Sequence, residues 1–211
     1  MKIKVYLLPI ILIFVSNIAM TQNSSMSVLE AKDLRNKVIE KSKSTTSIIS
    51  DFEQYKHLDF LSNDIKSSGK LVYKYPNFIK WEYQSPFKYS AIFKNNKLYI
   101  NDDGNKSDIN LASHKTFKSL NDLIIKSVKG DMFDESKFKI TYHKSTNNYI
   151  VSFVPLDKKM KSLIRKFVLK FDKVTLNVIE VKMIESSEDY TLLKFLNQIL
   201  NEPVTDSEFS N

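Results

Sequence analysis

The chain has 211 residues, a length typical of a single domain with a targeting segment. Its 42% hydrophobic and 27% charged residues indicate a folded globular protein rather than a disordered one. Cysteine is absent, which excludes disulfides, a thiol nucleophile and an acylated N-terminal cysteine. Only 3 glycines argue against glycine-rich nucleotide-binding loops. The net charge of +8 suits an anionic lipid or an acidic protein as partner.

The N-terminus has the form of a secretory signal peptide. Two lysines precede an apolar stretch from Val5 to Val15, and small or polar residues follow. Because this stretch is short for a membrane span, we expect a cleaved signal over residues 1–21, cut between Ala19 and Gln22. A retained anchor is the alternative. Export to the periplasm would make nucleic acid the least fitting partner, and none is expected.

A helix is predicted to begin at Val28 and to end between Ser42 and Thr46. Ser27 and Glu30 have the spacing of a capping box, in which each side chain accepts a hydrogen bond from the other residue's backbone amide. Apolar residues then recur at helical spacing, at Val28, Ala31, Leu34, Val38 and Ile39. This stripe would cover one face of a sheet.

Beyond this helix, apolar residues alternate with polar ones, which predicts strands. In chain order we expect strands at Ser47–Leu58, Ile65–Lys74, Phe78–Tyr83, Phe87–Lys94, from Leu98, around Ile109, and around Phe138–Tyr142, Tyr149–Phe153, Phe167–Phe171, Ile179–Met183 and Tyr190–Leu196. Asn95-Asn96 is a hairpin signal, and the run from Asp102 to Asn105 is a second turn. The tail from Gln198 is predicted to be irregular.

A second helix is predicted over 116–129, between the two runs of strands. Its apolar stripe includes Phe117, Leu120, Leu123 and Ile124, and Gly130 is a suitable stop signal.

Strands joined by short turns predict an antiparallel meander. About ten strands with one helix before them and one among them favour a strongly curved sheet or an open barrel. The fold class predicted from this pattern is therefore mainly β with helices, built on a strongly curved antiparallel sheet or an open barrel. No linker divides residues 22–211, which we expect to form one domain.

The segment from Gly69 to Pro86 (GKLVYKYPNFIKWEYQSP) resembles the signature of the LolA family of lipoprotein carriers. A glycine-led strand, a proline, a tryptophan-containing strand and a second proline follow one another. Phe52 and Gln54 are similar to the family's Phe-x-Gln, and Leu193–Asn197, followed by Asn201 and Phe209, is similar to its closing strand. The resemblance spans residues 28–209.

Membership of this family would imply a half-open antiparallel β-barrel, closed by the N-terminal helix and a central lid helix, with an apolar cavity for acyl chains. The expected partners are acylated lipoproteins, an inner-membrane lipoprotein-releasing ABC transporter and an outer-membrane acceptor, and the expected state is a monomer. The family often has an arginine directly before the first proline, which tethers the barrel to its lid. Here that lid-tether position is Tyr75, with Lys74 beside it, so the arginine is missing.

An acyl-chain carrier needs a concave apolar surface and no catalytic chemistry. The candidate cavity residues are those that share one face of the predicted strands in and near the signature: Leu71, Tyr73, Ile79, Trp81, Tyr83, Tyr89, Ala91 and Phe93. The alternative is that they fill a solid core against the helices. The central helix could likewise be a moving lid or a permanently packed element.

No enzymatic activity, cofactor or metal is expected. His57, His114 and His143 lie far apart in the sequence without ligand spacing, and Ser113-His114 lacks an orienting acid. Asp102 and Asp103 lack the ligand pattern of a calcium loop, and Glu185, Glu188 and Asp189 have the setting of a solvated turn. The chain therefore has no visible catalytic constellation.

Two basic clusters could face an anionic membrane or an acidic partner, or simply maintain solubility. One runs from Lys158 to Lys166, and the other combines Lys126, Lys129, Lys137 and Lys139. The leading functional hypothesis is a periplasmic carrier that ferries lipoproteins from the inner to the outer membrane. The alternative is a domain of the same fold that senses envelope lipid or lipoprotein and regulates a membrane protein.

Overall fold

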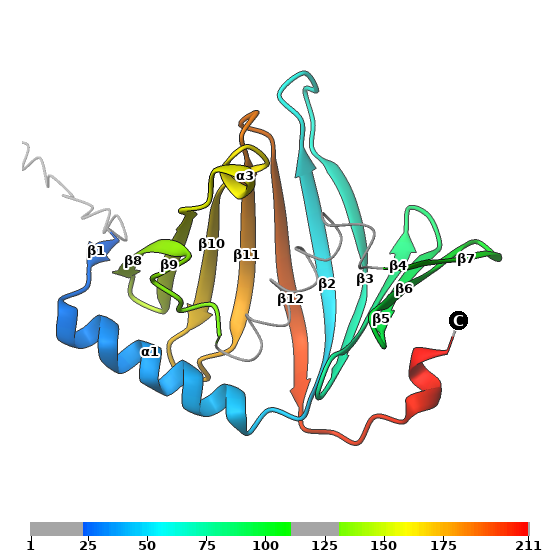
Figure 1. Cartoon of the computed structure of the whole chain (residues 1–211), viewed down its shortest axis with the longest axis horizontal. Coiled ribbons are helices and arrows are strands. Elements are labelled where there is room, and N and C mark those ends of the chain that lie inside the picture. The colour runs from blue at the N-terminus through cyan, green and yellow to red at the C-terminus, as the bar shows by residue number, and fades with distance from the viewer. Residues whose placement is uncertain (1–22, 111–130, 211) are drawn as a thin grey trace, which may run out of the picture.

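Twelve strands form one antiparallel sheet in the computed structural model, which describes residues 23–110 and 131–210. Strands make up 55% of the structure, and the sheet is curved but not closed (Figure 1). The elements in chain order are β1 (Ser24–Ser25), α1 (Val28–Lys43), β2 (Ser47–His57), β3 (Ile65–Lys74), β4 (Phe78–Ser85), β5 (Tyr89–Lys94), β6 (Lys97–Asp102), β7 (Asn105–Asn110), β8 (Phe138–Lys144), β9 (Asn148–Pro155), α3 (Lys158–Lys161), β10 (Ile164–Asp172), β11 (Val178–Glu185), β12 (Tyr190–Leu200) and a 3₁₀ turn, η1 (Asp206–Phe209).

The sheet consists of two meanders placed edge to edge. Strands β2 to β7 form one meander and β8 to β12 the other, and each strand pairs with its neighbour in sequence. The last strand, β12, then pairs antiparallel with β2, so that the C-terminal meander continues into the N-terminal one. In Figure 1 the orange β12 lies beside the cyan β2 at the centre of the sheet.

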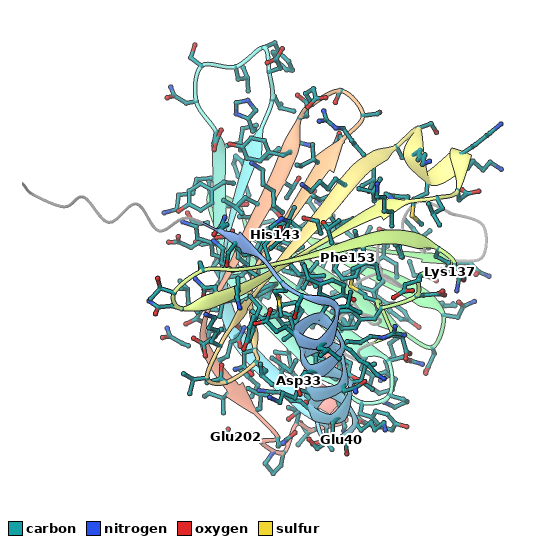
Figure 2. The ribbon with its side chains drawn as sticks, turned by 90° about the vertical axis from the view of Figure 1, so that its left-hand side faces the viewer. Asp33, Glu40, Lys137, His143, Phe153 and Glu202 are labelled. Atoms are coloured by element: carbon teal, nitrogen blue, oxygen red, sulfur yellow. The ribbon has the colours of Figure 1, made fainter. Side chains whose placement is uncertain are left out.

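Helix α1 covers the concave face of the β8–β11 half. Its buried residues Leu34 and Val38 join a core that includes Phe153 and Phe171 on the strands and Met132 in the segment before β8. Figure 1 shows α1 crossing the lower end of these strands. Figure 2 shows the molecule from the left-hand side of Figure 1, with Asp33 and Glu40 on the helix and Phe153 on β9. The apolar stripe of the helix therefore meets a sheet face, as its sequence predicted.

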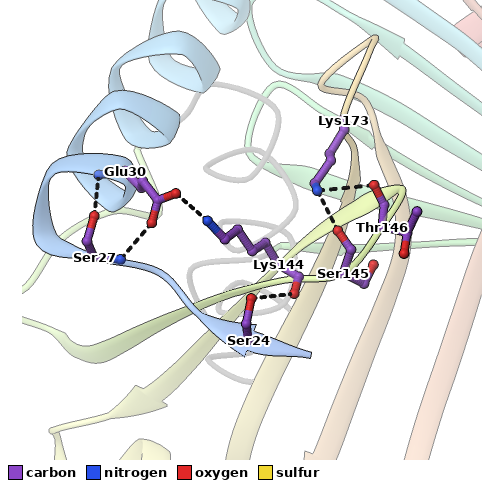
Figure 3. Close-up of polar contacts among 7 residues, drawn as sticks. All are labelled: Ser24, Ser27, Glu30, Lys144, Ser145, Thr146 and Lys173. Carbon is purple, nitrogen blue, oxygen red and sulfur yellow. Dashed lines mark hydrogen bonds and ion pairs between the residues drawn. The ribbon is translucent and has the colours of Figure 1, made fainter. Parts of the chain in front are cut away.

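A polar clip holds the start of α1 against β8 (Figure 3). The capping box is present: the Ser27 hydroxyl accepts from the Glu30 amide at 3.3 Å, and the Glu30 carboxylate accepts from the Ser27 amide at 2.9 Å. The same carboxylate pairs with Lys144 of β8. The Lys144 hydrogen bond and the Ser27 amide lower the pKa of Glu30 to about 2. Cap and ion pair thus share one carboxylate.

The other half of the sheet has its own core on the concave face. Phe52 lies at the centre, with Trp81 and Tyr83 packed edge-on against it at ring-centroid distances of 5.0 Å. Phe52 lies opposite Gly69 in the neighbouring strand. A Cβ at Gly69 would lie 1.9 Å from the carbonyl oxygen of Glu82, so the close approach of β3 and β4 requires glycine.

The C-terminal tail lies on the convex face. Phe209 of η1 is buried against Val72, Ile92 and Phe78, while Lys74 and Lys80 pair with Asp206 at 2.5 Å and Glu208 at 2.8 Å. The tail therefore adds a small core on the convex face of the β2–β7 meander, which we call the aromatic half of the sheet.

The predicted fold class, mainly β with one open antiparallel sheet, is confirmed, and several local features differ from the prediction. Strand β5 begins at Tyr89 rather than at Phe87, which lies in the turn after Pro86 and is 78% exposed. Strand β12 continues past a bulge to Leu200, so the expectation of an irregular tail from Gln198 was wrong for its first residues. Helix α3 was not predicted. The proposed signal segment and central helix lie outside the described residues.

Gly69→Ala should lower the free energy of unfolding by about 1–3 kcal/mol, because the new methyl group must displace the backbone of β4. Chemical denaturation checks this. Ser67→Ala on the same strand is the matched control and should change stability little, since it keeps an existing Cβ. Equal stability of the two variants would contradict the steric argument.

Glu30→Gln should make the melting temperature depend less on pH between pH 6 and pH 2. The native pKa of Glu30 lies near 2, below its ordinary value of 4.5, so the ionised carboxylate stabilises the fold above pH 4.5 and this stabilisation is lost as pH falls toward 2. Thermal unfolding between pH 6 and pH 2 should show a wild-type advantage that disappears at the acidic end. Glu40→Gln, which removes a charge from the same helix away from Lys144, is the control. An advantage that persists at pH 2 would refute the linkage.

Candidate functional site

A cavity of about 110 Å³ lies between α1 and the concave face, across the junction of the two meanders. Its walls come from α1, from β10, β11 and β12 of one meander, and from β2, β3 and β4 of the other. The lining residues are Val38, Lys41, Ser42, Thr45, Ile48, Ser50, Leu71, Trp81, Met132, Leu169, Phe171, Leu176, Asn177, Val178, Val181, Leu193, Phe195, Gln198 and Leu200.

The sheet wall of the cavity is apolar because of strand register. Leu169 of β10 lies opposite Val181 of β11, which lies opposite Leu193 of β12, so one row of apolar side chains crosses three strands on the same face. Phe195 continues the wall beside Phe52, and its ring centroid lies 6.3 Å from that of Trp81. Side chains alternate between the faces of a strand, so this surface is continuous without a continuous apolar sequence.

One end of the cavity is polar. Lys41 of α1 donates to the Thr175 carbonyl and to the Asn177 side chain in the β10–β11 turn. Gln198 of β12 donates to the Val178 carbonyl at 2.7 Å. Burial lowers the pKa of Lys41, although Asp172 nearby opposes this shift. The cavity therefore combines an apolar wall with a cationic rim at the C-terminal end of α1.

The sequence-predicted cavity residues all lie on the concave face, and two of them, Leu71 and Trp81, line the cavity. Tyr73, Ile79 and Phe93 are buried in the aromatic half with Leu98. Tyr83 and Ala91 are partly buried against the same cluster, and the ring of Tyr89 lies 5.9 Å from that of Tyr83. Most of the predicted set thus surrounds the cavity wall rather than forming it.

Phe52 and Gln54, the Phe-x-Gln pair, both contact Tyr83. Phe52 packs on the ring, and the Tyr83 hydroxyl donates to the Gln54 side chain at 3.0 Å. Burial raises the pKa of Tyr83 to about 12, so the hydroxyl stays protonated and keeps this hydrogen bond. The motif fixes the aromatic half next to the cavity.

Sequence reasoning missed the contribution of α1, β10, β11 and β12 to the cavity. Val181 and Leu193 belong to strands that were predicted correctly, but their position opposite each other follows from register. Lys41 lies in the last turn of α1, where a basic residue is explained by the helix dipole alone. The resemblance at Leu193–Asn197 pointed to β12, but no signal in the linear sequence distinguished Val181 or Lys41 from ordinary core or surface positions.

Tyr75, at the family's lid-tether position, is 61% exposed in the turn between β3 and β4. Its amide donates to the Thr46 carbonyl at 2.8 Å, and the neighbouring Lys74 pairs with Asp206 of the tail. The candidate lid residues Phe117, Leu120, Leu123 and Ile124 lie outside the described residues.

Several polar residues that could suggest catalysis in the sequence have structural partners, while Ser113 and His114 lie outside the described residues. His57 lies 2.8 Å from Asp64 and stacks on Tyr190, while Glu185 pairs with Lys56. Within 23–110 and 131–210, no group of three or more potential metal ligands is found. Asn101 accepts from the Gly104 amide at 2.8 Å in the turn that contains Asp102 and Asp103. No helix among the described segments has the length and hydropathy of a membrane span.

The basic cluster at Lys158–Lys166 includes α3, whose three lysines are exposed together with Leu156 and Leu163. Arg165 of the cluster pairs with Glu188. In the other cluster Lys137 pairs with Asp134 at 2.7 Å, and Lys126 and Lys129 lie outside the described residues.

The sequence model of the family described as "Outer membrane lipoprotein carrier protein LolA" matches residues 43–211. Among curated proteins, none matches the chain in sequence. Among solved structures, a DUF1329 family protein from Desulfovibrio piger is 12% identical, with a TM-score of 0.50 over 87% of this chain and 97% of its own.

Two further solved structures share the fold. The lipoprotein LppX of Mycobacterium tuberculosis is 10% identical, with a TM-score of 0.50 over 85% of this chain and 99% of its own. A chain of the Pseudomonas aeruginosa MucA/MucB complex is 10% identical, with a TM-score of 0.50 over 86% of this chain and 61% of its own. At identities this low, the similarity of these three structures shows a common fold and nothing about function.

Proposed function

We propose that this chain, which belongs to the LolA family, is a carrier that binds the acyl chains of lipoproteins beneath α1 and takes them from the inner to the outer membrane. The observation that carries the proposal is the cavity itself, an apolar pocket of about 110 Å³ on the concave face of an open sheet. Its sheet wall offers Leu169, Val181 and Leu193 to a ligand and no reactive group.

The physical need for such a carrier follows from the hydrophobic effect. Each methylene of an acyl chain that leaves water recovers about 0.8 kcal/mol, so a lipid with two or three chains does not cross an aqueous space unaided. A pocket that covers the chains makes the transfer between membranes possible. The lining supplies burial, which is the only contribution that this transport step requires.

Binding requires the cavity to expand. An engineered cavity of about 150 Å³ holds a single benzene, and a long acyl chain is several times larger than benzene. Helix α1 is suited to move, because within it only Leu34 and Val38 are buried against the sheet. We infer that an entering chain displaces these two side chains and takes their place on the wall.

The cellular setting of the proposal is the periplasm, reached by a cleaved signal peptide. LolA family proteins are generally periplasmic. The proposed partners are acylated lipoproteins, an inner-membrane ABC transporter that releases them and an outer-membrane acceptor, with the carrier acting as a monomer and without enzymatic activity.

A second candidate is a sensing domain that binds lipid or lipoprotein and regulates another envelope protein. The resemblance to a chain of the MucA/MucB complex supports this candidate, because it shows that a domain of this fold can be part of a protein complex. A pull-down of membrane proteins with and without bound lipopeptide separates the two candidates. A sensor would bind different membrane proteins when the lipopeptide is bound, whereas a carrier would transfer the lipopeptide to its partner.

Trp81 should report occupancy of the cavity. It is the only tryptophan, is 6% exposed and lines the pocket beside Leu71. A synthetic lipopeptide with two palmitoyl chains should shift its emission to the blue as the chains surround the indole, and brominated chains should quench it. The unacylated peptide is the control. Emission unaffected by both lipopeptides would contradict a cavity ligand.

Leu193→Trp should block lipopeptide binding by filling the cavity. Leu193 lines the wall at the centre of β12, and an indole there occupies space that a chain would use. Calorimetric titration should show at least a tenfold loss of affinity, about 1.4 kcal/mol. Thermal unfolding should show that the variant remains folded.

Leu192→Trp is the matched control, because the neighbouring residue on the same strand points to the opposite face. It should bind lipopeptide like the wild type. Equal binding by the two variants would place the chains elsewhere and overturn the proposal.

A further inference from the structure

Polarity is distributed unevenly along the cavity. Toward the aromatic half the lining is Leu71, Trp81 and Phe195, whereas at the end of α1 it is Lys41, Asn177 and Gln198. A ligand that matches this lining has a long apolar part and a polar group at one end. The arrangement selects an amphiphile and sets its orientation.

The charged member of the rim, Lys41, is held by uncharged acceptors. Its ammonium group contacts the Thr175 carbonyl and the Asn177 amide oxygen. Among the described residues, no carboxylate lies within the 4.0 Å of an ion pair to it. This differs from Lys37 on the same helix, which pairs with Asp33 at 2.7 Å.

The acidic group that interacts with Lys41 at longer range, Asp172, is held by other hydrogen bonds. Asp172 accepts from the Thr175 amide at 2.7 Å, from the Thr175 hydroxyl at 2.8 Å and from the Val174 amide at 3.1 Å. Its carboxylate thus stabilises the β10–β11 turn. Lys41 remains the cation of a partly buried rim with hydrogen bonds that an incoming anion can replace.

We propose that the cavity also accepts anionic amphiphiles, and that Lys41 binds their headgroup, a phosphate or a carboxylate, while the acyl chain lies along the wall toward Trp81. This inference rests on the proposed acyl-chain site and adds a second class of ligand to the acylated lipoproteins. Replacing a carbonyl by an anion turns a neutral acceptor into a charge-assisted one, which is roughly twice as strong. Part of the desolvation cost is already met, because burial lowers the pKa of Lys41 in the unliganded protein.

A purely structural role makes a different prediction. Lys41 also ties the end of α1 to the β10–β11 turn, and a loss of that tie would affect all ligands alike. The anionic subsite affects only ligands that carry a negative headgroup. The ratio of affinities for anionic and neutral ligands with the same chain therefore separates the two roles.

The experiment measures the binding of three single-chain probes below their micelle concentrations, with Trp81 emission as the readout. The probes are palmitate, 1-palmitoyl-lysophosphatidylglycerol and neutral 1-monopalmitoylglycerol. The wild type should bind both anionic probes at least about tenfold more tightly than the neutral one. Lys41→Gln should lose this preference with unchanged neutral affinity, and Lys41→Arg should retain it.

Lys37→Gln removes a lysine one turn earlier on the same helix, so it is the matched control and should keep the wild-type preference. Comparison of palmitate with the lysophospholipid shows whether a carboxylate or a phosphate is preferred. Equal affinities of the wild type for anionic and neutral probes would overturn the subsite, as would an equal loss of both in Lys41→Gln. Failure of all three probes while the two-chain lipopeptide still binds would overturn the subsite alone. Failure of the lipopeptide as well would overturn the proposed function, and the subsite with it.

Discussion

The pairing of β12 with β2 is the constraint on which the rest of the structure depends. Each meander pairs its own strands locally, but only this seam places the two concave faces next to each other. The cavity spans the seam, since Leu193 and Phe195 come from one side and Ile48 and Leu71 from the other. Without the seam, the protein would have two shallow sheets and no pocket between them.

The seam is secured where its ladder is interrupted. A bulge separates Leu196 from Ile199, and the buried Ser50 hydroxyl donates to the Leu196 carbonyl at 2.9 Å. Asn197, in the left-handed region at φ 50°, donates from its side chain to Asp51 at 2.8 Å. Asn201 accepts from the Thr46 amide at 2.8 Å beyond the end of β12. Polar side chains thus replace the backbone hydrogen bonds that the bulge and the strand end would lose.

The two sides of the seam differ in how they are packed. The aromatic half is held by direct edge-on packing of Trp81 and Tyr83 against Phe52, and the hydrogen bond to Gln54 fixes the ring of Tyr83. The other half depends on a helix that buries only Leu34 and Val38 and is clipped at its start by Glu30. A ligand that opens the cavity would therefore displace the helix, because the aromatic side has no comparable removable cover among the described residues.

The sequence was sufficient to predict those elements that depend only on residues close to one another in the chain. The capping box at Ser27, the alternation from Gly69 to Tyr83 and the turn at Asn95 depend on neighbours a few positions away, and their patterns led to helix, strands and hairpin. Alternation also identified which side chains share the concave face. The resemblance to the family signature then predicted that these strands form an open half-barrel.

The tertiary structure alone decided which of those side chains line the cavity. Register between strands distant in sequence places Val181 and Leu193 in one row, and the packing of α1 brings Lys41 to the rim. Periodicity reports the face of a side chain but not its partner on another strand, and a lysine in a last helical turn has the same sequence signature whether it faces water or a pocket. For that reason Trp81 could be placed near a ligand from its sequence, whereas the polar end that orients the ligand required the folded chain.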